Sequence, residues 1–531
     1  MAADTVLLNG NVLTMDPQRP RAQAVAVWRN RILVVGDNDT VRAEVGPRTR
    51  VIDLAGKTVL PGLNDNHCHP MGYGFALEWI DASPATVRTL AELLERFREA
   101  ARQAPLGAWV RGRGYDDTRL DVRRHPTRYD LDPMTGDHPA ILIRTCGHMS
   151  VVNSAALRLA GITRDTPDPD GGRIVRDENG EPTGLLQERA QDLVRQLLPE
   201  PKVEDIKRAL IAAGKQFLAM GITSVIEAGI SKPEELQAYQ ELRREQALPV
   251  RTSLMMLIDH TLEPMEALGL RTGLGDEWLR IGPLKLLQDG SGGGRTALMS
   301  VPYPGEPENY GIAVYTQEQL DQAFLRVARL GCQGAAHAIG DRAIDMILTA
   351  FERALATYPQ SDPRWRIEHC GLLRPDLLDR MQRLQVLAIP QPAFVYYLGD
   401  SYLRNFTEEQ LALSYPCRAW LDRGIVAVGS SDTPVVPAHP WVNIRSAVTR
   451  LTQDGQRMGP EQAVTVDEAL RMFTVNGAYA SFEERIKGSI TPGKLADLIV
   501  VAHDPRTVEP EELHTIRHEL TMIDGNVVYE A

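Results

Sequence analysis

The sequence predicts an α/β fold, in which a (β/α)8 TIM barrel is joined to a small β domain built from both ends of the chain. Through the middle of the chain, apolar runs of strand length alternate with amphipathic helical stretches, which is typical of βα units and a parallel barrel. Strand-like segments separated by polar turns occupy both ends. Several apolar runs end in a histidine, a lysine or an aspartate, and a barrel gathers such strand ends at one face.

The length and composition describe a globular chain with a large core. At 531 residues the chain exceeds one ordinary domain, although a barrel with insertions absorbs much of that length. Hydrophobic residues at 43% and charged residues at 24% give no indication of disorder. A net charge of −12 argues against a nucleic-acid-binding surface, which needs a basic patch. We therefore expect an uncharged small-molecule substrate and no nucleic-acid partner.

Cysteine usage and hydropathy predict a cytoplasmic protein. The five cysteines are odd in number and show no Cys-x-x-Cys spacing, so a reducing compartment fits best. The chain does not open with the basic head and apolar core of a signal peptide. None of its apolar runs approaches the roughly 20 residues needed to span a bilayer. We expect neither secretion nor a membrane partner.

The predicted β domain combines residues 1–61 with residues 485–531. Near the start, TVLLNGNVLTM and AVAVWRNRILVVG alternate apolar residues around Asn-Gly and Arg-Asn-Arg turn signals. Near the end, LADLIVVAHD and HELTMIDGNVVYE show the same pattern. Matching segments at both ends suggest one small domain, so the barrel is expected over residues 62–484.

The barrel elements follow in order along the middle of the chain. The stretches 86–104, 204–220 and 316–331 carry the i, i+3, i+4 spacing that buries one helix face on a sheet. The last of these is predicted to begin after Thr316 as its N-cap and to close at Gly331. The eight predicted strands are 62–69, 139–146, 221–228, 279–288, 333–338, 364–370, 386–391 and 425–431.

Residues 150–200 break this alternation, because a stretch rich in Gly, Pro and Asp surrounds two short apolar runs. The pattern predicts an inserted β-rich hairpin, which either walls a substrate pocket or forms a surface excursion. The connection between the first two predicted strands holds GAWVRGRGYDDTRL, with Trp109, Arg111 and Tyr115 close together. These three are predicted to bind substrate, with a buried aromatic prop as the alternative.

A His-x-His pair at His67 and His69 ends the first predicted strand. Side chains two apart on an extended strand share a face, so both imidazoles point the same way while Cys68 points the other way. That geometry suits one metal ion. Alone, such a pair is a weak signal, and its weight comes from further candidates along the chain.

Four more candidate ligands stand at the carboxyl ends of later apolar runs. Taken singly, a lysine could reach water from a strand end and a histidine could be a satisfied core residue. Because a barrel gathers strand ends around one site, a shared site explains all of them together. The four are Lys285 in GPLKLLQDG, His337 in GAAHAIGD, His369 in WRIEHCG and Asp432 in IVAVGSSDTP.

The order His-x-His, Lys, His, His, Asp resembles that of the amidohydrolase superfamily. The phrases HAIGDRAID (337–345) and KLLQDGSGGGRTA (285–297) resemble its N-substituted formamide deformylase-like branch, amidohydrolase family 3. The likeness covers nearly the whole chain, from NGNVLTM near the start to PGKLADLIV near the end. The resemblance implies that the terminal β domain is a β-sandwich beside the barrel.

The resemblance also implies the metal chemistry. Neutral imidazoles, carboxylates and a carbamate suit zinc. Some members of the superfamily work with a single metal, so one or two zinc ions are expected, with the binuclear arrangement favoured. The implied assignment is one ion on His67, His69 and Asp432, a second on His337 and His369, and a bridge through a carboxylated Lys285.

Hydrolysis of a carbon–nitrogen bond is the function that the resemblance implies. A metal-bound hydroxide attacks an amide carbonyl, and Asp432 moves a proton from water to the leaving amine. The expected substrate is a small linear amide, such as an N-substituted formamide or an N-acyl amine. A deaminase, a cyclic amidase or an isomerase is the alternative, because the ligand set is shared and does not choose the substrate. The sequence leaves open whether the chain forms a homo-oligomer.

The sequence also predicts roles for other residues near these strand ends. His148, in CGHMSVVN, is predicted either to bind the carbonyl group of the substrate or to form a hydrogen bond within its own loop. The glycine run GSGGGRT (290–296) either cradles an anion or is a flexible loop after the fourth strand. Cys68 and Cys370 adjoin ligand histidines and, by strand alternation, are expected to pack away from the metal.

Overall fold

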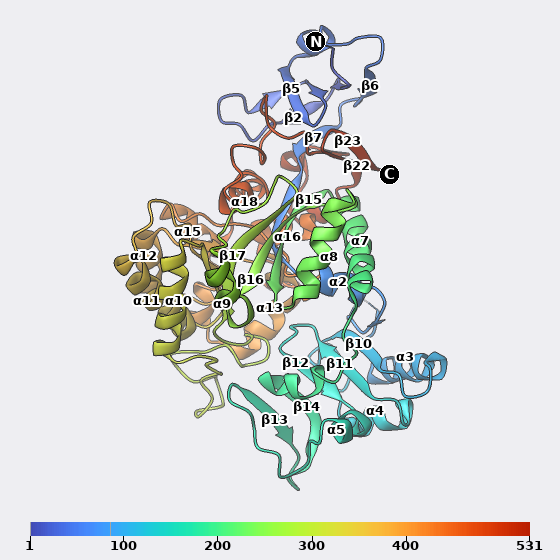
Figure 1. Cartoon of the computed structure of the whole chain (residues 1–531), viewed down its shortest axis with the longest axis vertical. Coiled ribbons are helices and arrows are strands. Elements are labelled where there is room, and N and C mark those ends of the chain that lie inside the picture. Colours follow the sequence, from blue (N-terminus) through green and yellow to red (C-terminus); the bar gives the residue numbers. More distant parts are fainter. Residues whose placement is uncertain (1, 85) are drawn as a thin grey trace.

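The protein consists of a central barrel with a β region at each end (Figure 1). The structure, a computed structural model, describes residues 2–84 and 86–531. Both chain termini lie in the β region at the top of Figure 1, and a sheet inserted after the first barrel strand lies at the bottom. The predicted α/β class, with a barrel and a β-sandwich from both termini, is confirmed.

Seven parallel strands form the wall of the barrel, and their side chains are largely buried on both faces because helices cover the outside. Residues 425–431 fill the eighth position. The amide of Ala388 donates to Val426 (3.1 Å), and the amide of Asn66 donates to Gly429 (3.4 Å), which closes the barrel between its last and first strands. In sheet order the strands are β8 (Leu63–Cys68), β15 (Ile222–Ile230), β16 (Arg251–Leu257), β17 (Leu279–Leu287), β18 (Gly334–Ala338), β19 (Arg366–His369) and β20 (Leu387–Ile389).

Two of the strand assignments made from the sequence need correction. The prediction that residues 139–146 form a barrel strand is wrong, because β11 (Ala140–Arg144) belongs to the inserted sheet. The barrel strand β16 was missed. Both segments, AILIR and RTSLMML, are buried on two faces, and periodicity does not tell which sheet such a segment joins. The two errors offset each other, so β17 is still the fourth strand.

The helices that cover the barrel bury one face against it. For α10, the hydroxyl oxygen of Thr316 accepts a hydrogen bond from the Gln319 amide (3.4 Å), and Gly331 adopts a left-handed φ of 76°, so both predicted caps are confirmed. The helices are α2 (Pro70–Ala76), α7 (Val203–Ala219), α8 (Pro233–Arg244), α9 (Ile258–Leu268), α10 (Gln317–Leu330), α11 (Asp341–Thr357), α12 (Pro375–Leu384), α13 (Ala393–Asn405), α14 (Glu408–Ala412), α15 (Cys417–Asp422), α16 (Pro440–Thr449), α17 (Val466–Met472) and α18 (Val475–Ala480).

The inserted sheet separates β8 from β15 and is wider than the predicted hairpin. Residues 150–200 contain that hairpin, β13 with β14, but four more strands precede it. Two hydrophobic clusters cover its two faces, one around Phe97 and one around Ile141. Its strands are β9 (Ile80–Asp81), β10 (Val110–Tyr115), β11 (Ala140–Arg144), β12 (Met149–Val152), β13 (Gly172–Arg176) and β14 (Pro182–Glu188), with α3 (Leu90–Gln103), α4 (Arg128–Thr135), α5 (Ser154–Leu159) and α6 (Asp192–Arg195).

The terminal sheets pack face to face around one hydrophobic cluster that contains residues of both, such as Val25 and Leu498. The N-terminal segment supplies a four-stranded sheet in the order β5–β4–β1–β6, and both termini share a six-stranded sheet in the order β23–β22–β21–β7–β2–β3. Their bounds are β1 (Thr5–Leu8), β2 (Asn11–Leu13), β3 (Arg21–Ala22), β4 (Ala24–Trp28), β5 (Arg31–Gly36), β6 (Arg50–Asp53), β7 (Thr58–Pro61), β21 (Leu498–Val501), β22 (His518–Ile523) and β23 (Asn526–Glu530), and α1 (Asn38–Arg42) follows β5.

Two findings concern the whole chain. None of the helices within the described residues combines the length and the apolar character required to cross a membrane. The five cysteines are all buried free thiols.

Candidate metal centre and adjoining cavities

The six residues predicted as metal ligands lie at the carboxyl ends of the barrel strands. His67 is in β8 and His69 directly precedes α2, while Lys285 lies near the end of β17. The other three come from β18, β19 and the closing segment, in that order His337, His369 and Asp432. Parallel strands bring these ends to one face, where the inserted sheet also joins the barrel.

Three of the six form a tight cluster. Donor atoms of His67, His69 and Asp432 all lie within 4.8 Å of one another. The Nε2 atoms of His67 and His69 lie 3.4 and 3.3 Å from Oδ1 of Asp432. Burial opposes ionisation of this carboxyl, but the hydrogen bond to His69 and the surrounding imidazoles outweigh it and hold the pKa of Asp432 well below the usual value. Asp432 is therefore an anion between two imidazoles.

A buried carboxylate orients the first histidine. Nδ1 of His67 is hydrogen-bonded to Oε2 of Glu368, and Arg366 binds the same carboxylate through Nη2 (2.9 Å). Burial lowers the pKa of His67 to about 4, whereas Arg366 and His67 outweigh burial and lower the pKa of Glu368 to about 2. The imidazole is thus neutral, donates Nδ1–H to Glu368 and presents the lone pair of Nε2 to the cluster.

Lys285 lies beside this cluster and is fully buried. Its Nζ is 3.3 Å from Nε2 of His67 and donates to the carbonyl of Ala228 (3.0 Å). Burial lowers its pKa, since a charged ammonium is disfavoured without water. The side chain does not snorkel to solvent.

His337 and His369 stand next to each other on the other side of His67. Their ring centroids are 4.3 Å apart, and the ring of His369 is 4.9 Å from that of His67. Nε2 of His337 lies 3.1 Å from the Gly290 carbonyl, which leaves its Nδ1 as the acceptor nitrogen. Nδ1 of His369 lies 2.7 Å from the amide oxygen of Gln391, which leaves its Nε2.

Backbone conformation also marks the site. His369 and Asp432 have φ values of 66° and 61°, in the left-handed region that non-glycine residues rarely occupy. Such conformations persist only where the surroundings hold them in place, and they cluster at functional sites.

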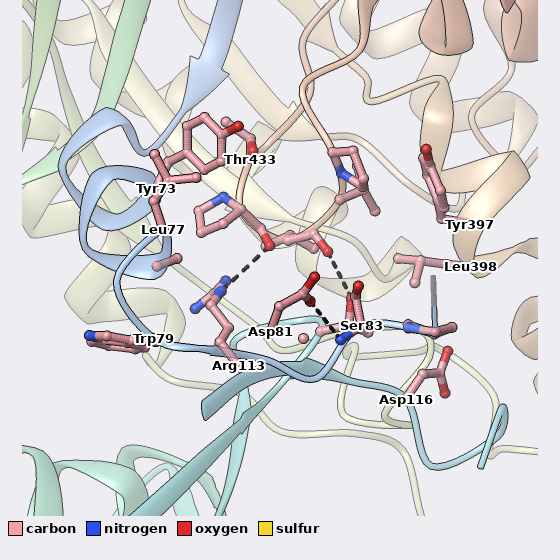
Figure 2. Close-up of a pocket in the computed structure, with 18 of the residues that line it drawn as sticks. Tyr73, Leu77, Trp79, Asp81, Ser83, Arg113, Asp116, Tyr397, Leu398 and Thr433 are labelled. Atoms are coloured by element: carbon pink, nitrogen blue, oxygen red, sulfur yellow. Dashed lines mark hydrogen bonds between the residues drawn. The ribbon is translucent and has the colours of Figure 1, made fainter. Parts of the chain in front are cut away.

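A large cavity of about 500 Å³ opens beside the cluster (Figure 2). Its wall is mostly apolar and includes Leu77, Trp79 and Tyr397, while the residues directly after Asp432 form one side of it. Arg113 points into it and donates through Nε to the carbonyl of Pro434 (3.5 Å). This cavity has room for a substantial organic group.

A second chamber of about 20 Å³ lies at the histidines themselves. It shares Leu398 and Val435 with the large cavity, so the two adjoin. This volume is only slightly larger than the roughly 10–15 Å³ needed to hold one water molecule. The chamber therefore accommodates only a very small group. Its lining residues are Arg144, Cys146, His148, Ser291, Gly292, Gly293, His337, Ile339, His369, Phe394, Leu398, Tyr402, Asp432 and Val435.

The predicted substrate-binding residues are divided by the structure. His148 lines the small chamber, where burial opposes protonation but the Glu188 carboxylate, 2.7 Å from Nδ1, raises its pKa to about 9. Tyr115 is fully buried, bonds to His125 (3.0 Å) and belongs to the core of the inserted sheet, which is the aromatic-prop alternative. Trp109 packs against the cluster on the other face of that sheet.

Arg111 lines neither of the two cavities. Its guanidinium lies 5.9 Å from the ring centroid of Trp79, whereas Arg113, two residues later, lines the large cavity. Both share one face of β10, so alternation alone could not separate them. Sequence reasoning also missed Glu368, which adjoins His369 in the motif WRIEHCG, and Arg144, which ends a strand assigned to the barrel.

The residues present fit a metal ion. Two neutral imidazole nitrogens and an ionised carboxylate converge, and neutral histidine and carboxylate are common ligands of divalent metals. A carboxylate orients His67, as is usual for metal-bound histidine. Two further imidazoles and a buried amine adjoin this group, so the pocket holds donors for more than one ion.

Comparisons with known proteins agree with this geometry. The profile of the amidohydrolase family matches residues 50–529. The chain is 33% identical to an N-substituted formamide deformylase of Arthrobacter pascens, over 99% of this chain and 98% of that protein. It is also 33% identical to the protein LONG AFTER FAR-RED 3 of Arabidopsis thaliana, over 94% and 88%. Among solved structures, a metal-dependent hydrolase of Pyrococcus furiosus shares 31% identity and a TM-score of 0.75, covering 95% of this chain and all of that one. The chain therefore belongs to the amidohydrolase family and is a metal-dependent hydrolase acting on carbon–nitrogen bonds.

Proposed function

We propose that the protein hydrolyses linear amides that carry a small acyl group and a bulky, apolar N-substituent. The observation that carries this proposal is the arrangement of two unequal spaces around Asp432. The chamber at the histidines holds about 20 Å³, and the apolar cavity beyond Asp432 holds about 500 Å³. An amide placed with its carbonyl at the metal centre has its acyl side in the chamber and its nitrogen side in the cavity. N-substituted formamides have this shape.

Zinc is the ion that we propose for the site, held first by His67, His69 and Asp432. A carboxylated Lys285 would extend the site to a second ion on His337 and His369. The low pKa of Lys285 favours the neutral amine, which is the form that reacts with CO₂. When bound, the metal supplies Lewis acidity, which makes water nucleophilic near neutral pH and withdraws charge from a carbonyl oxygen.

Asp432 is the proposed proton carrier. Its lowered pKa means that it is ionised at neutral pH, and its position at the cluster places an oxygen where it can take a proton from the attacking water. It stands between the chamber and the residues that wall the cavity, so the proton can pass to the amide nitrogen as the carbon–nitrogen bond breaks. The products are a carboxylate on the acyl side and an amine on the nitrogen side.

The aromatic and aliphatic wall of the cavity would bind the N-substituent. Trp79, Tyr397 and Leu77 supply apolar surface, and each buried methylene of the substrate contributes about 0.8 kcal/mol to binding. An apolar substituent therefore lowers KM, while formyl or another very small acyl group is selected by the chamber.

A screen of a mixed amide library tests this proposal. Purified protein, with its metal content measured, would be incubated with amides in which acyl group and N-substituent are varied independently. We expect amine release to be fastest with N-benzyl- or N-alkylformamides and to fall steeply from formyl to acetyl to propionyl. Release of ammonia from an amino-substituted ring, or opening of cyclic amides in place of linear ones, would contradict it.

A further inference from the structure

The small chamber contains a buried donor that has no partner within the described residues. Arg144, from β11 of the inserted sheet, is 1% exposed. Its Nε donates to Oδ1 of Asp117 (2.7 Å), and Nη2 lies 3.5 Å from Oδ1 of Asp116. Nη1 is buried and lacks a hydrogen-bond acceptor. Burying an unpaired N–H of a charged group is unfavourable, so its retention needs an explanation.

The unpaired donor faces open space next to the candidate metal ligands. Arg144 lines the chamber together with His337, His369 and Asp432. A Cβ built on Gly293 would lie 3.6 Å from Nη1, so the absence of a side chain there leaves room beside this nitrogen. The neighbouring Gly292 is needed for packing, because a Cβ there would lie 2.5 Å from the Tyr402 ring.

His148 lies on the same wall of the chamber. Its Nδ1 is engaged by Glu188, which leaves Nε2 for other contacts, and its ring centroid is 5.1 Å from that of His337. Asp116 and Asp117 hold Arg144, as Glu188 holds His148, so both groups are fixed before any ligand enters. The oriented, unpaired guanidinium N–H of Arg144 is a site for an oxygen that carries negative charge.

We propose that Arg144, through Nη1, binds the acyl oxygen of the substrate and then the carboxylate product, and that the chamber is a subsite for formate. This inference rests on the proposed function. In the reaction, water adds to the carbonyl carbon, the carbon–nitrogen bond breaks, the nitrogen leaves as an amine with a proton, and the acyl group leaves as a carboxylate. Negative charge thus develops on the oxygen atoms that the guanidinium faces.

Formate binding to the holoprotein tests the inference without any amide substrate. Calorimetric titration of the metal-loaded protein with sodium formate, acetate and propionate at constant ionic strength should show tightest binding for formate. Arg144→Lys keeps a cation near Asp117 but removes Nη1, and should weaken formate binding about 10- to 100-fold, as expected for a hydrogen bond to a charged group. Arg176→Met removes an arginine on β13 of the same sheet, paired with Asp168 away from the chamber, and should leave binding unchanged.

A second variant covers the case in which Arg144→Lys fails to fold. Gly293→Ala leaves every ion pair intact and fills the space beside Nη1, with its Cβ 3.3 Å from Oγ of Ser401 as the nearest contact. We expect it to keep its melting temperature and lose formate affinity. Formate that binds both variants as tightly as wild type, or propionate that binds wild type as tightly as formate, overturns the inference. Failure of the amide screen with Arg144-dependent formate binding intact would refute the proposed substrate and leave this subsite standing.

Discussion

At the residue scale, neighbours set the protonation of the metal centre. Burial keeps His67 neutral, Glu368 orients its ring, and the hydrogen bond to His69 favours the ionised form of Asp432. A metal competes with protons for the same lone pairs, so donors that are already unprotonated near neutral pH bind it without that cost. The protonation states of the site are therefore preorganised for binding a cation.

Asp432→Asn separates proton transfer from metal binding. Asparagine is nearly isosteric but cannot accept the proton from water, so turnover should fall by about 10²- to 10⁴-fold while KM changes little. The variant should fold and retain part of its metal. Turnover, metal content and melting would be measured side by side, with the exposed Asp165→Asn as a control. Near-normal turnover with metal retained would remove Asp432 from the catalytic role.

Lys285→Ala tests the bridge. Loss of a carbamate would remove ligand oxygens, so the variant should bind less metal per chain and lose activity, whereas the exposed Lys215→Ala on α7 should behave as wild type. Added bicarbonate should speed reconstitution of wild-type apoprotein and have no effect on Lys285→Ala. Full metal content and normal turnover in the variant would favour a single-metal site without a bridge.

At the scale of the elements, the carboxyl ends of the barrel strands hold the candidate catalytic residues, and the opposite end of the barrel holds a structural contact. The barrel strands supply the six predicted ligands, and the inserted sheet supplies Arg144 and His148 to the same chamber. At the other end of the barrel, β22 packs against the turn before β15, where a Cβ on Gly221 would lie 2.7 Å from the His518 ring. Glycine at this turn, with φ of 78°, permits that close approach.

His518 should make this junction sensitive to acid. The Thr521 hydroxyl donates to the Leu218 carbonyl and accepts Nε2–H of His518 (2.6 Å), while Nδ1 is buried without a partner in the described part of the chain. Burial lowers the pKa of His518 to about 4 from an ordinary 6.5. A lowered histidine pKa contributes stability that is present above pH 6.5 and is lost as the pH falls toward 4.

Denaturant unfolding of the metal-free protein at pH 7 and pH 4.5 checks this expectation. From pH 7 to pH 4.5, the unfolding free energy should fall less in His518→Gln than in wild type. The glutamine amide can still donate to Thr521 but does not titrate. His260→Gln, on the exposed surface of α9, should show the same fall as wild type. Equal falls in all three proteins would show that His518 does not contribute.

At the scale of the whole molecule, the metal centre joins the two ends of the barrel chain. His67 belongs to the first strand and Asp432 to the segment that closes the barrel after the last one. The Asp432 amide also donates to the His67 carbonyl (2.7 Å). A metal held by both side chains would therefore stabilise the closure of the barrel.

Metal removal should accordingly cost stability as well as activity. A ligand that binds only the folded state stabilises it by about 4 kcal/mol at a free concentration 1,000 times its Kd. Chelation should abolish turnover and lower the melting temperature, and zinc should restore both with about one to two ions per chain. Thermal scans with and without chelator, beside elemental analysis, measure this. Full activity in a metal-free preparation would contradict the proposed chemistry.

The sequence by itself determined the barrel, the terminal β domain and the six candidate ligands, because each depends on local periodicity or on residue types at strand ends. His67 and His69 share a face by alternation, and the caps of α10 follow from Thr316 and Gly331. These are short-range properties of the chain. The family resemblance, which covers nearly the whole chain, then assigned the six candidate ligands to one shared site.

Only the tertiary structure decided which sheet each buried strand joins and which side chains meet across the site. β11 and β16 are both buried strands, but one pairs within the inserted sheet and the other within the barrel. Arg113 and Arg144 reach the two cavities because that inserted sheet sits over the barrel face. Contacts between segments this far apart in the chain depend on how whole sheets pack, and no local pattern encodes that packing.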